Sequence, residues 1–151
     1  MQAKNIKKVV LRVSAAIAVP LVGLSLSGCG AQEKANVILS TSQAGYSAVV
    51  STEANTGTAM AAQLSGPLVL GSGGCFEVMD STGKETWAVF PVGSTVIDGQ
   101  IPALKVGEKT YNVGDTVNFG GGFGQLNEES LKVAGTCALE SEPFFIHSTT
   151  H

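Results

Sequence analysis

Residues 66–90 read GPLVLGSGGCFEVMDSTGKETWAVF, and their pattern indicates the fold class. It contains three short apolar runs, at 67–70, 75–79 and 86–90. Clusters of Gly, Ser, Asp and Thr separate these runs, and such clusters are typical of turns. The stretch therefore predicts three short β-strands joined by tight turns.

The same alternation of short strands and turn signals continues to residue 147. Further strands are expected at 101–106, 115–119, 130–137 and 144–147, and the glycine run at 120–122 indicates a turn or a bulge. Seven short strands in about 80 residues are typical of one all-β barrel or sandwich. We therefore expect a small all-β domain of short antiparallel strands over 66–147, followed by a tail at 148–151.

One segment of this domain favours a helix. At 125–131, Asn127 can cap a helix N-terminus, and Glu128 and Glu129 place negative charge where the helix dipole favours it. In strand count and order the outline resembles an OB-type barrel, with the helix between the third and fourth strands. A seven-stranded sandwich is the alternative.

Residues 30–65, upstream of this domain, are mostly Ala, Ser, Thr, Gly, Gln and Asn. The segment holds one aromatic residue, Tyr46, and too little apolar surface to offset the entropy of ordering it. We expect most of it to be a flexible tether. A second interpretation is open, in which the short apolar runs at 37–39 and 48–50 pair as edge strands.

The first residues of the chain are typical of an export signal. Lys4, Lys7, Lys8 and Arg12 precede an uncharged, mainly apolar stretch at 13–26. A basic start, a short apolar core and small residues before a cut indicate a secretory signal peptide, whereas a membrane-spanning helix needs about 20 apolar residues.

The apolar stretch ends in Leu26-Ser27-Gly28-Cys29, which resembles the lipobox of bacterial lipoproteins. The resemblance implies a cut after Gly28, a diacylglyceryl group on the Cys29 sulfur and a mature chain that begins at Cys29. It divides the N-terminal part into a signal peptide (1–28) and a lipidated N-terminus with a tether (29–65). The expected location is the cell membrane, facing outside the cytoplasm. Gly30 after the cysteine resembles the pattern that permits sorting to an outer membrane, if the host has one.

Two cysteines remain in the mature chain, Cys75 and Cys137. An even pair of cysteines in an exported protein is expected to be oxidised, so we predict a disulfide between them. Two separate buried thiols are the alternative.

The charge of the mature chain excludes one class of partner. All twelve acidic residues but only five of the nine basic residues follow residue 28, which gives a net charge of −7. Such a surface is poorly matched to nucleic acid. We therefore expect no nucleic-acid partner, and the lipid anchor is the expected contact with the membrane.

Groups suited to catalysis or cofactor binding are few. Histidine occurs only at His147 and His151, so neither a histidine-based nucleophile relay nor a three-histidine zinc site can be built inside the domain. The glycine-rich segment 120–124 lacks the Lys-Ser/Thr pair of a phosphate-binding loop. We expect no metal and no cofactor.

Three acids around one predicted hairpin, Glu77, Asp80 and Glu85, are the candidates for carboxylate chemistry. Such groups can bind calcium or act as a carboxylate pair on sugars, but the spacing of an Asp-rich calcium loop is missing. We interpret them as solvated residues of strand faces and turns.

The function expected from this inventory is non-catalytic binding at the cell envelope. The partner would be an envelope protein, a polymer or a small ligand, and an exposed Phe123 or Phe145 would mark the binding surface. The alternative is a small envelope hydrolase that uses the carboxylates of Glu77 and Glu85 alone.

Overall fold

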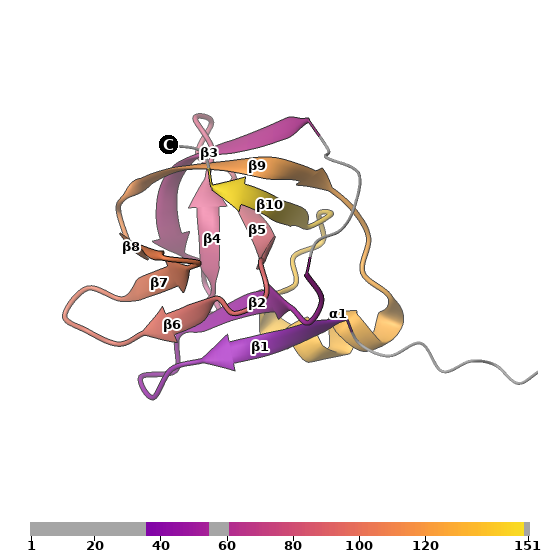
Figure 1. Ribbon diagram of the computed structural model, residues 1–151, viewed down its shortest axis with the longest axis horizontal. Coiled ribbons are helices and arrows are strands. Elements are labelled where there is room, and N and C mark those ends of the chain that lie inside the picture. Colours follow the sequence, from indigo (N-terminus) through magenta and orange to yellow (C-terminus); the bar gives the residue numbers. More distant parts are fainter. Residues whose placement is uncertain (1–35, 55–60, 150–151) are drawn as a thin grey trace, which may run out of the picture. The chain divides into compact units, whose positions relative to one another are not determined.

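The computed structural model describes residues 36–54 and 61–149, which form ten β-strands, one α-helix and one 3-10 helix (Figure 1). In chain order these are β1 (Val37–Thr41), β2 (Ser47–Ser51), β3 (Ala62–Leu70), β4 (Phe76–Met79), β5 (Glu85–Phe90), β6 (Thr95–Ile97), β7 (Ala103–Val106), β8 (Lys109–Asn112), β9 (Thr116–Phe123), α1 (Glu128–Ala134), η1 (Gly135–Cys137) and β10 (Phe144–Thr149).

Five of the strands close into a barrel. β4 pairs with β3 and β5, β9 pairs with β3 and β10, and β10 pairs with β5, so the ring β3-β4-β5-β10-β9 is complete. All pairings in the ring are antiparallel except that of β5 with β10. Numbered along the chain, the barrel strands follow the order 1-2-3-5-4, as in an OB-type barrel. The expected all-β class is confirmed, and the architecture is a barrel.

The helix is not where the OB-type outline placed it. Between the third and fourth barrel strands, β5 and β9, the chain forms a separate antiparallel sheet of β6, β7 and β8. α1 and η1 lie instead between β9 and β10, and they replace the strand that was expected at 130–137.

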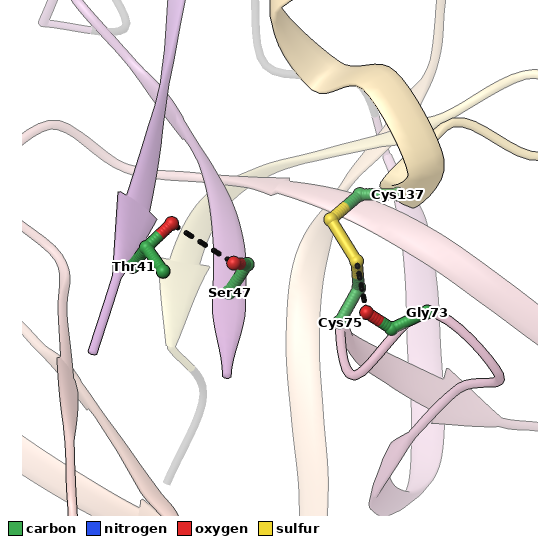
Figure 2. The surroundings of a disulfide bond; sticks show 5 residues. All are labelled: Thr41, Ser47, Gly73, Cys75 and Cys137. Atoms are coloured by element: carbon green, nitrogen blue, oxygen red, sulfur yellow. Dashed lines mark hydrogen bonds between the residues drawn. A yellow bond between two sulfur atoms is a disulfide. The ribbon is translucent and has the colours of Figure 1, made fainter. Parts of the chain in front are cut away.

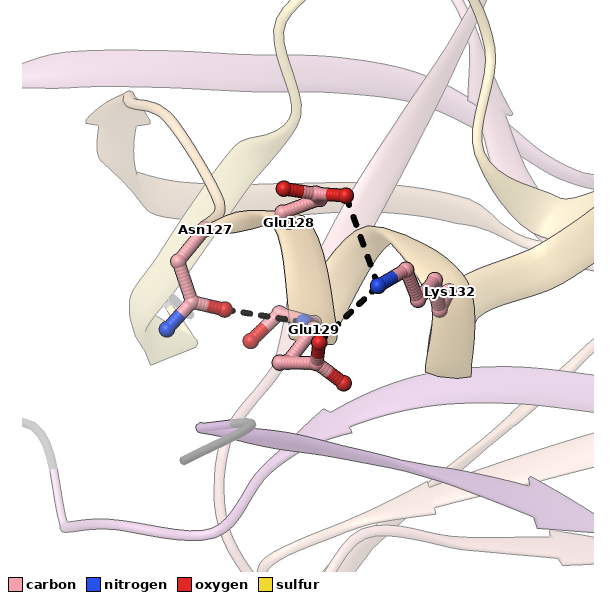
Figure 3. A network of polar contacts seen from close by, with 5 residues as sticks. Asn127, Glu128, Glu129 and Lys132 are labelled. Atoms are coloured by element: carbon pink, nitrogen blue, oxygen red, sulfur yellow. Dashed lines mark hydrogen bonds and ion pairs between the residues drawn. The ribbon is translucent and has the colours of Figure 1, made fainter. Parts of the chain in front are cut away.

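The ends and charges of α1 explain why this segment is helical. Asn127 caps the helix as expected, because its side-chain oxygen accepts a 2.8 Å hydrogen bond from the Ser130 amide (Figure 3). Lys132 pairs with Glu128 at 3.4 Å and with Glu129 at 2.9 Å. Ser130 and Ala134, four residues apart, are the buried positions of the helix. This helical spacing overrides the strand propensity of 130–137.

The segment expected to be a tether is in part a β-hairpin. β1 pairs with β2 in antiparallel fashion, and β2 adds to β5 in parallel with Val49 opposite Val89. The tether prediction is therefore wrong for 37–51, where the chain follows the second interpretation. The domain also begins before Gly66, since β3 starts at Ala62. Residues 29–35 and 55–60 of the expected tether lie outside the described residues.

Alternation along β4 and β5 separates two apolar clusters. Phe76 and Val78 of β4 are buried in the larger cluster with Phe90 of β5, whose ring packs edge-on against Phe119 at 6.1 Å. Trp87 and Val89 alternate with these residues and belong to a second cluster. The second cluster also contains side chains from 126–139, so it packs α1 and the chain after it against the barrel wall.

The glycine run at 120–122 lies within β9 and is not a turn, but its pairing with β10 contains an irregularity of the kind expected for a bulge. Gly121 of β9 lies opposite Ile146 of β10, and the register shifts between Ile146 and Ser148 of β10. A Cβ atom on Gly121 would overlap the carbonyl oxygen of Phe145, so glycine permits the close approach of the two strands. β10 continues to Thr149 and includes part of the expected tail.

Candidate functional site

An open pocket lies between β5 and the segment that joins β9 to β10. Its volume is about 330 Å³. Its apolar lining residues are Trp87, Leu126, Leu131, Leu139 and Pro143, and its other lining residues are Gly124, Gln125, Glu140, Ser141 and Glu142. Apolar walls with a few polar groups are the usual composition of small-ligand sites.

Trp87 fixes one wall of this pocket to the barrel. Its indole Nε1 donates a 2.7 Å hydrogen bond to the carbonyl oxygen of Ser141, and the side chain is 2% exposed. A buried indole N–H requires such a partner. The bond therefore holds the chain before β10 against β5.

A disulfide adds a second link between the barrel and the segment that joins β9 to β10. Cys75, just before β4, is bonded to Cys137 at the end of η1, with their Cα atoms 5.5 Å apart (Figure 2). This is the pair that the sequence predicted. The carbonyl oxygen of Gly73 lies 3.7 Å from the Cys75 Sγ. The bond ties the β3–β4 turn to the segment that lines the pocket.

The polar side of the pocket is acidic. Glu140 and Glu142 are exposed, and the Glu142 carboxylate accepts a 3.3 Å hydrogen bond from the Gln125 side chain. None of the described lining residues is basic. Lys132 on α1 is already paired with two glutamates. The pocket therefore combines an apolar wall with two carboxylates that lack an ion-pair partner among the described residues.

Glu77 does not face solvent, contrary to its interpretation as a solvated strand residue. It is 2% exposed and lies opposite Trp87 in the β4–β5 ladder, and its Oε2 atom has no hydrogen-bond partner among the described residues. Burial, and secondarily the negative charge of Glu85, raises the pKa of Glu77 to about 7. A Cβ atom on Gly71 would overlap this carboxyl group.

The two acids named for hydrolase chemistry are neighbours on one face of the barrel wall. Glu85 lies opposite Met79, two positions along the ladder from the Glu77–Trp87 pair, so both acids are on the same face. Neither Glu77 nor Glu85 lines the pocket at Trp87. The structure thus brings the two acids together but buries one of them.

The remaining candidate residues either stabilise a turn or lie outside the pocket lining. Asp80 closes the β4–β5 turn, where hydrogen bonds from Thr82 and then Lys84 lower its pKa. His147 lies in β10, whereas Cys29 and His151 lie outside the described residues. Within 36–54 and 61–149, no three His, Cys, Asp or Glu side chains are grouped as metal ligands, and no helix is long and apolar enough to cross a bilayer.

Of the two aromatic residues expected to mark a binding surface, Phe123 is the exposed one. It is 52% exposed and packs edge-on against Phe144 at 5.3 Å. Phe145 is half-buried and packs against the second cluster. Phe123 directly precedes Gly124, which lines the pocket, so the exposed ring lies next to this site in the chain.

Sequence reasoning missed the lining residues between Leu126 and Pro143. The sequence predicts a helix and a strand over 125–137 and neither over 138–143, and it does not single out the acids there as part of a site. The available signal was the run Glu140-Ser141-Glu142-Pro143, polar residues before a proline that cannot continue a helix, which indicates a surface loop. Comparison of the chain with protein-family models, curated proteins and solved structures finds no match.

Proposed function

We propose that the chain is an exported bacterial lipoprotein whose barrel is a non-catalytic binding module. The leader with its basic start and the tetrapeptide Leu26-Ser27-Gly28-Cys29 support export and lipidation at Cys29. Acyl chains on Cys29 would hold the module at the cell membrane, outside the cytoplasm, because each buried methylene contributes about 0.8 kcal/mol.

The pocket at Trp87 is the observation that carries the binding part of the proposal. Its walls come from two distant parts of the chain, Trp87 and the 124–143 segment, which the Trp87–Ser141 hydrogen bond holds together. The Cys75–Cys137 bond fixes the same 124–143 segment to the chain just before β4. A site that is already formed loses little conformational entropy when a ligand binds. A binding function explains why a small barrel carries two such links around one pocket.

A second candidate function, a carboxylate hydrolase, is favoured by one observation. The pKa of Glu77 is raised to about 7, and Glu77 lies beside Glu85, so the pair offers a general acid and a second carboxyl group. The burial of Glu77 opposes this function, because a general acid must come within hydrogen-bond reach of the substrate. We therefore place binding first.

Membrane partition tests the lipoprotein proposal. In a host that processes lipoproteins, the wild-type chain should fractionate with membranes and enter the detergent phase, and Cys29→Ser should abolish this behaviour or leave an unprocessed precursor. Ser25→Ala, which leaves the four lipobox residues intact, is the matched control and should behave as wild type. Equal membrane partition of the wild-type protein and a Cys29→Ser protein from which the leader has been removed would overturn the proposal.

Hydrolase assays separate the two functions. The purified protein should leave envelope polysaccharides intact. Turnover that is lost in both Glu77→Gln and Glu85→Gln, but kept in the exposed-site control Glu53→Gln, would replace binding by the hydrolase function.

A further inference from the structure

We propose that the pocket at Trp87 binds a small organic cation, an ammonium or guanidinium group carried on an apolar body. This inference rests on the proposed binding function and names the chemistry of its ligand. It starts from the two kinds of surface that meet in the pocket: the apolar side chains around Trp87 and the carboxylates of Glu140 and Glu142.

Desolvation decides the charge of the ligand. Any molecule that covers the apolar wall removes water from the neighbouring carboxylates, and this loss is costly unless the ligand returns hydrogen bonds or opposite charge. Gln125 supplies one hydrogen bond to Glu142, and none of the described lining residues supplies a positive charge. A cationic group compensates the carboxylates for the lost water by both hydrogen bonds and opposite charge. A neutral group offers hydrogen bonds alone, and an anion is repelled.

The size of the pocket favours a small molecule over a macromolecular segment. Its volume of about 330 Å³ is at the lower end of the range of small-ligand cavities, roughly 300–1,000 Å³. The surrounding domain supports the same sign of charge, because the described residues contain eleven acids and four lysines. Such a surface raises the local concentration of cations.

Trp87 provides a direct signal for binding, since it is the single tryptophan of the chain and lines the pocket. The experiment uses the mature lipoprotein in zwitterionic vesicles. Trp87 fluorescence is titrated with phenethylamine, phenethyl alcohol and hydrocinnamate, which share an aromatic body and differ in charge. Each titration is corrected with vesicles that lack the protein.

The amine should give a saturable change and bind about two- to fivefold more tightly than the alcohol, the size expected for exposed ion pairs. This advantage should shrink at about 1 M salt, where screening is strong. It should also disappear in the Glu140→Gln/Glu142→Gln variant and persist in Glu53→Gln/Glu108→Gln. The control variant makes the same change of net charge at two exposed glutamates outside the pocket lining.

The outcomes separate this inference from the function on which it rests. Equal binding of amine and alcohol would overturn the cation proposal and leave a small-ligand pocket. Binding of a lysine-rich peptide without binding of the amine would overturn the small-molecule assignment and leave a binding module. No saturable change with any probe would overturn the assignment of the pocket as a cation site, whereas membrane partition tests the lipoprotein proposal separately.

Discussion

Burial of Glu77 beside Trp87 makes the stability of the barrel depend on pH. The folded protein holds the pKa of this carboxyl group at about 7, above its usual value of 4.5, through burial and then through Glu85. Between these two values the folded state keeps a proton that the unfolded chain has released. The free energy of unfolding should therefore fall as pH rises from about 4.5 to about 7, by up to about 1.4 kcal/mol per pH unit.

Glu77→Gln should remove this contribution, because glutamine keeps the shape of the side chain without its charge. We expect the variant to be more stable than wild type above pH 7 and to lose the decline between acidic and neutral pH. Urea unfolding at about pH 5 and pH 8 measures both effects. The exposed substitution Glu53→Gln should keep the wild-type pH dependence. A wild-type decline no larger than that of Glu77→Gln would contradict this account of the buried carboxyl group.

The burial of Glu77 could not be predicted from its neighbours in the sequence. Strand alternation correctly places Phe76 and Val78 on one face and Glu77 on the other. The other face of a strand is often solvated, but here it carries Trp87, which is bonded to Ser141, far along the chain. Contacts between residues that are far apart in the chain produce no local pattern in the sequence.

The hairpin of β1 and β2 belongs to the folded domain, and this can be tested by truncation. Ala48 and Val50 of β2 are buried in the larger apolar cluster, the one that contains Phe76 and Val78, and residues 62–65 of β3 pair with β9. A fragment that begins at Gly66 should therefore lose cooperative thermal unfolding, whereas a chain that begins at Gly30 should keep it. Circular dichroism during heating measures this difference. Cooperative unfolding of both chains at the same temperature would show that the hairpin is dispensable.

The disulfide is the second element whose contribution can be measured. Its two cysteines are 62 residues apart in sequence, and closing a loop of this length stabilises a protein by about 4 kcal/mol in the chain-entropy account. Cys75→Ala/Cys137→Ala should lower the melting temperature by several degrees or more. Reduction of the wild-type protein should have a similar effect and should leave the double variant unchanged. An unaltered melting temperature after complete reduction would contradict the role of this bond.

The elements that were predicted correctly are those with a strong local pattern. β4 and β5 follow the apolar runs and turns of 75–90, and α1 begins directly after the predicted cap, Asn127. The short strands β6 and β8, of three and four residues, have no such pattern and were missed. β1 and β2 lie in a segment of low hydrophobicity, and the pairing of β2 with β5 comes from distant residues. The pocket was missed for the same reason, since Trp87 and the 124–143 segment meet only in the folded chain.

The whole molecule combines a proposed lipid anchor at Cys29 with a barrel that carries an acidic, partly apolar pocket. The pocket and the lipid anchor can be tested independently. The barrel and its disulfide follow from the structure, and the anchor is proposed from the sequence Leu26-Ser27-Gly28-Cys29. A loss of ligand binding would leave the anchor intact, and a failure of lipidation would leave the pocket intact.

Mass spectrometry of the mature N-terminus is the decisive measurement for the proposed lipid anchor. We predict that the protein isolated from a host with lipoprotein processing begins at Cys29 and carries two or three acyl chains on that residue. The N-terminal peptide should then shift by the mass of a diacylglyceryl group, with or without a further acyl chain. A mature N-terminus at any other residue, or an unmodified Cys29, would contradict the proposal that this protein is anchored to the membrane by lipid on Cys29.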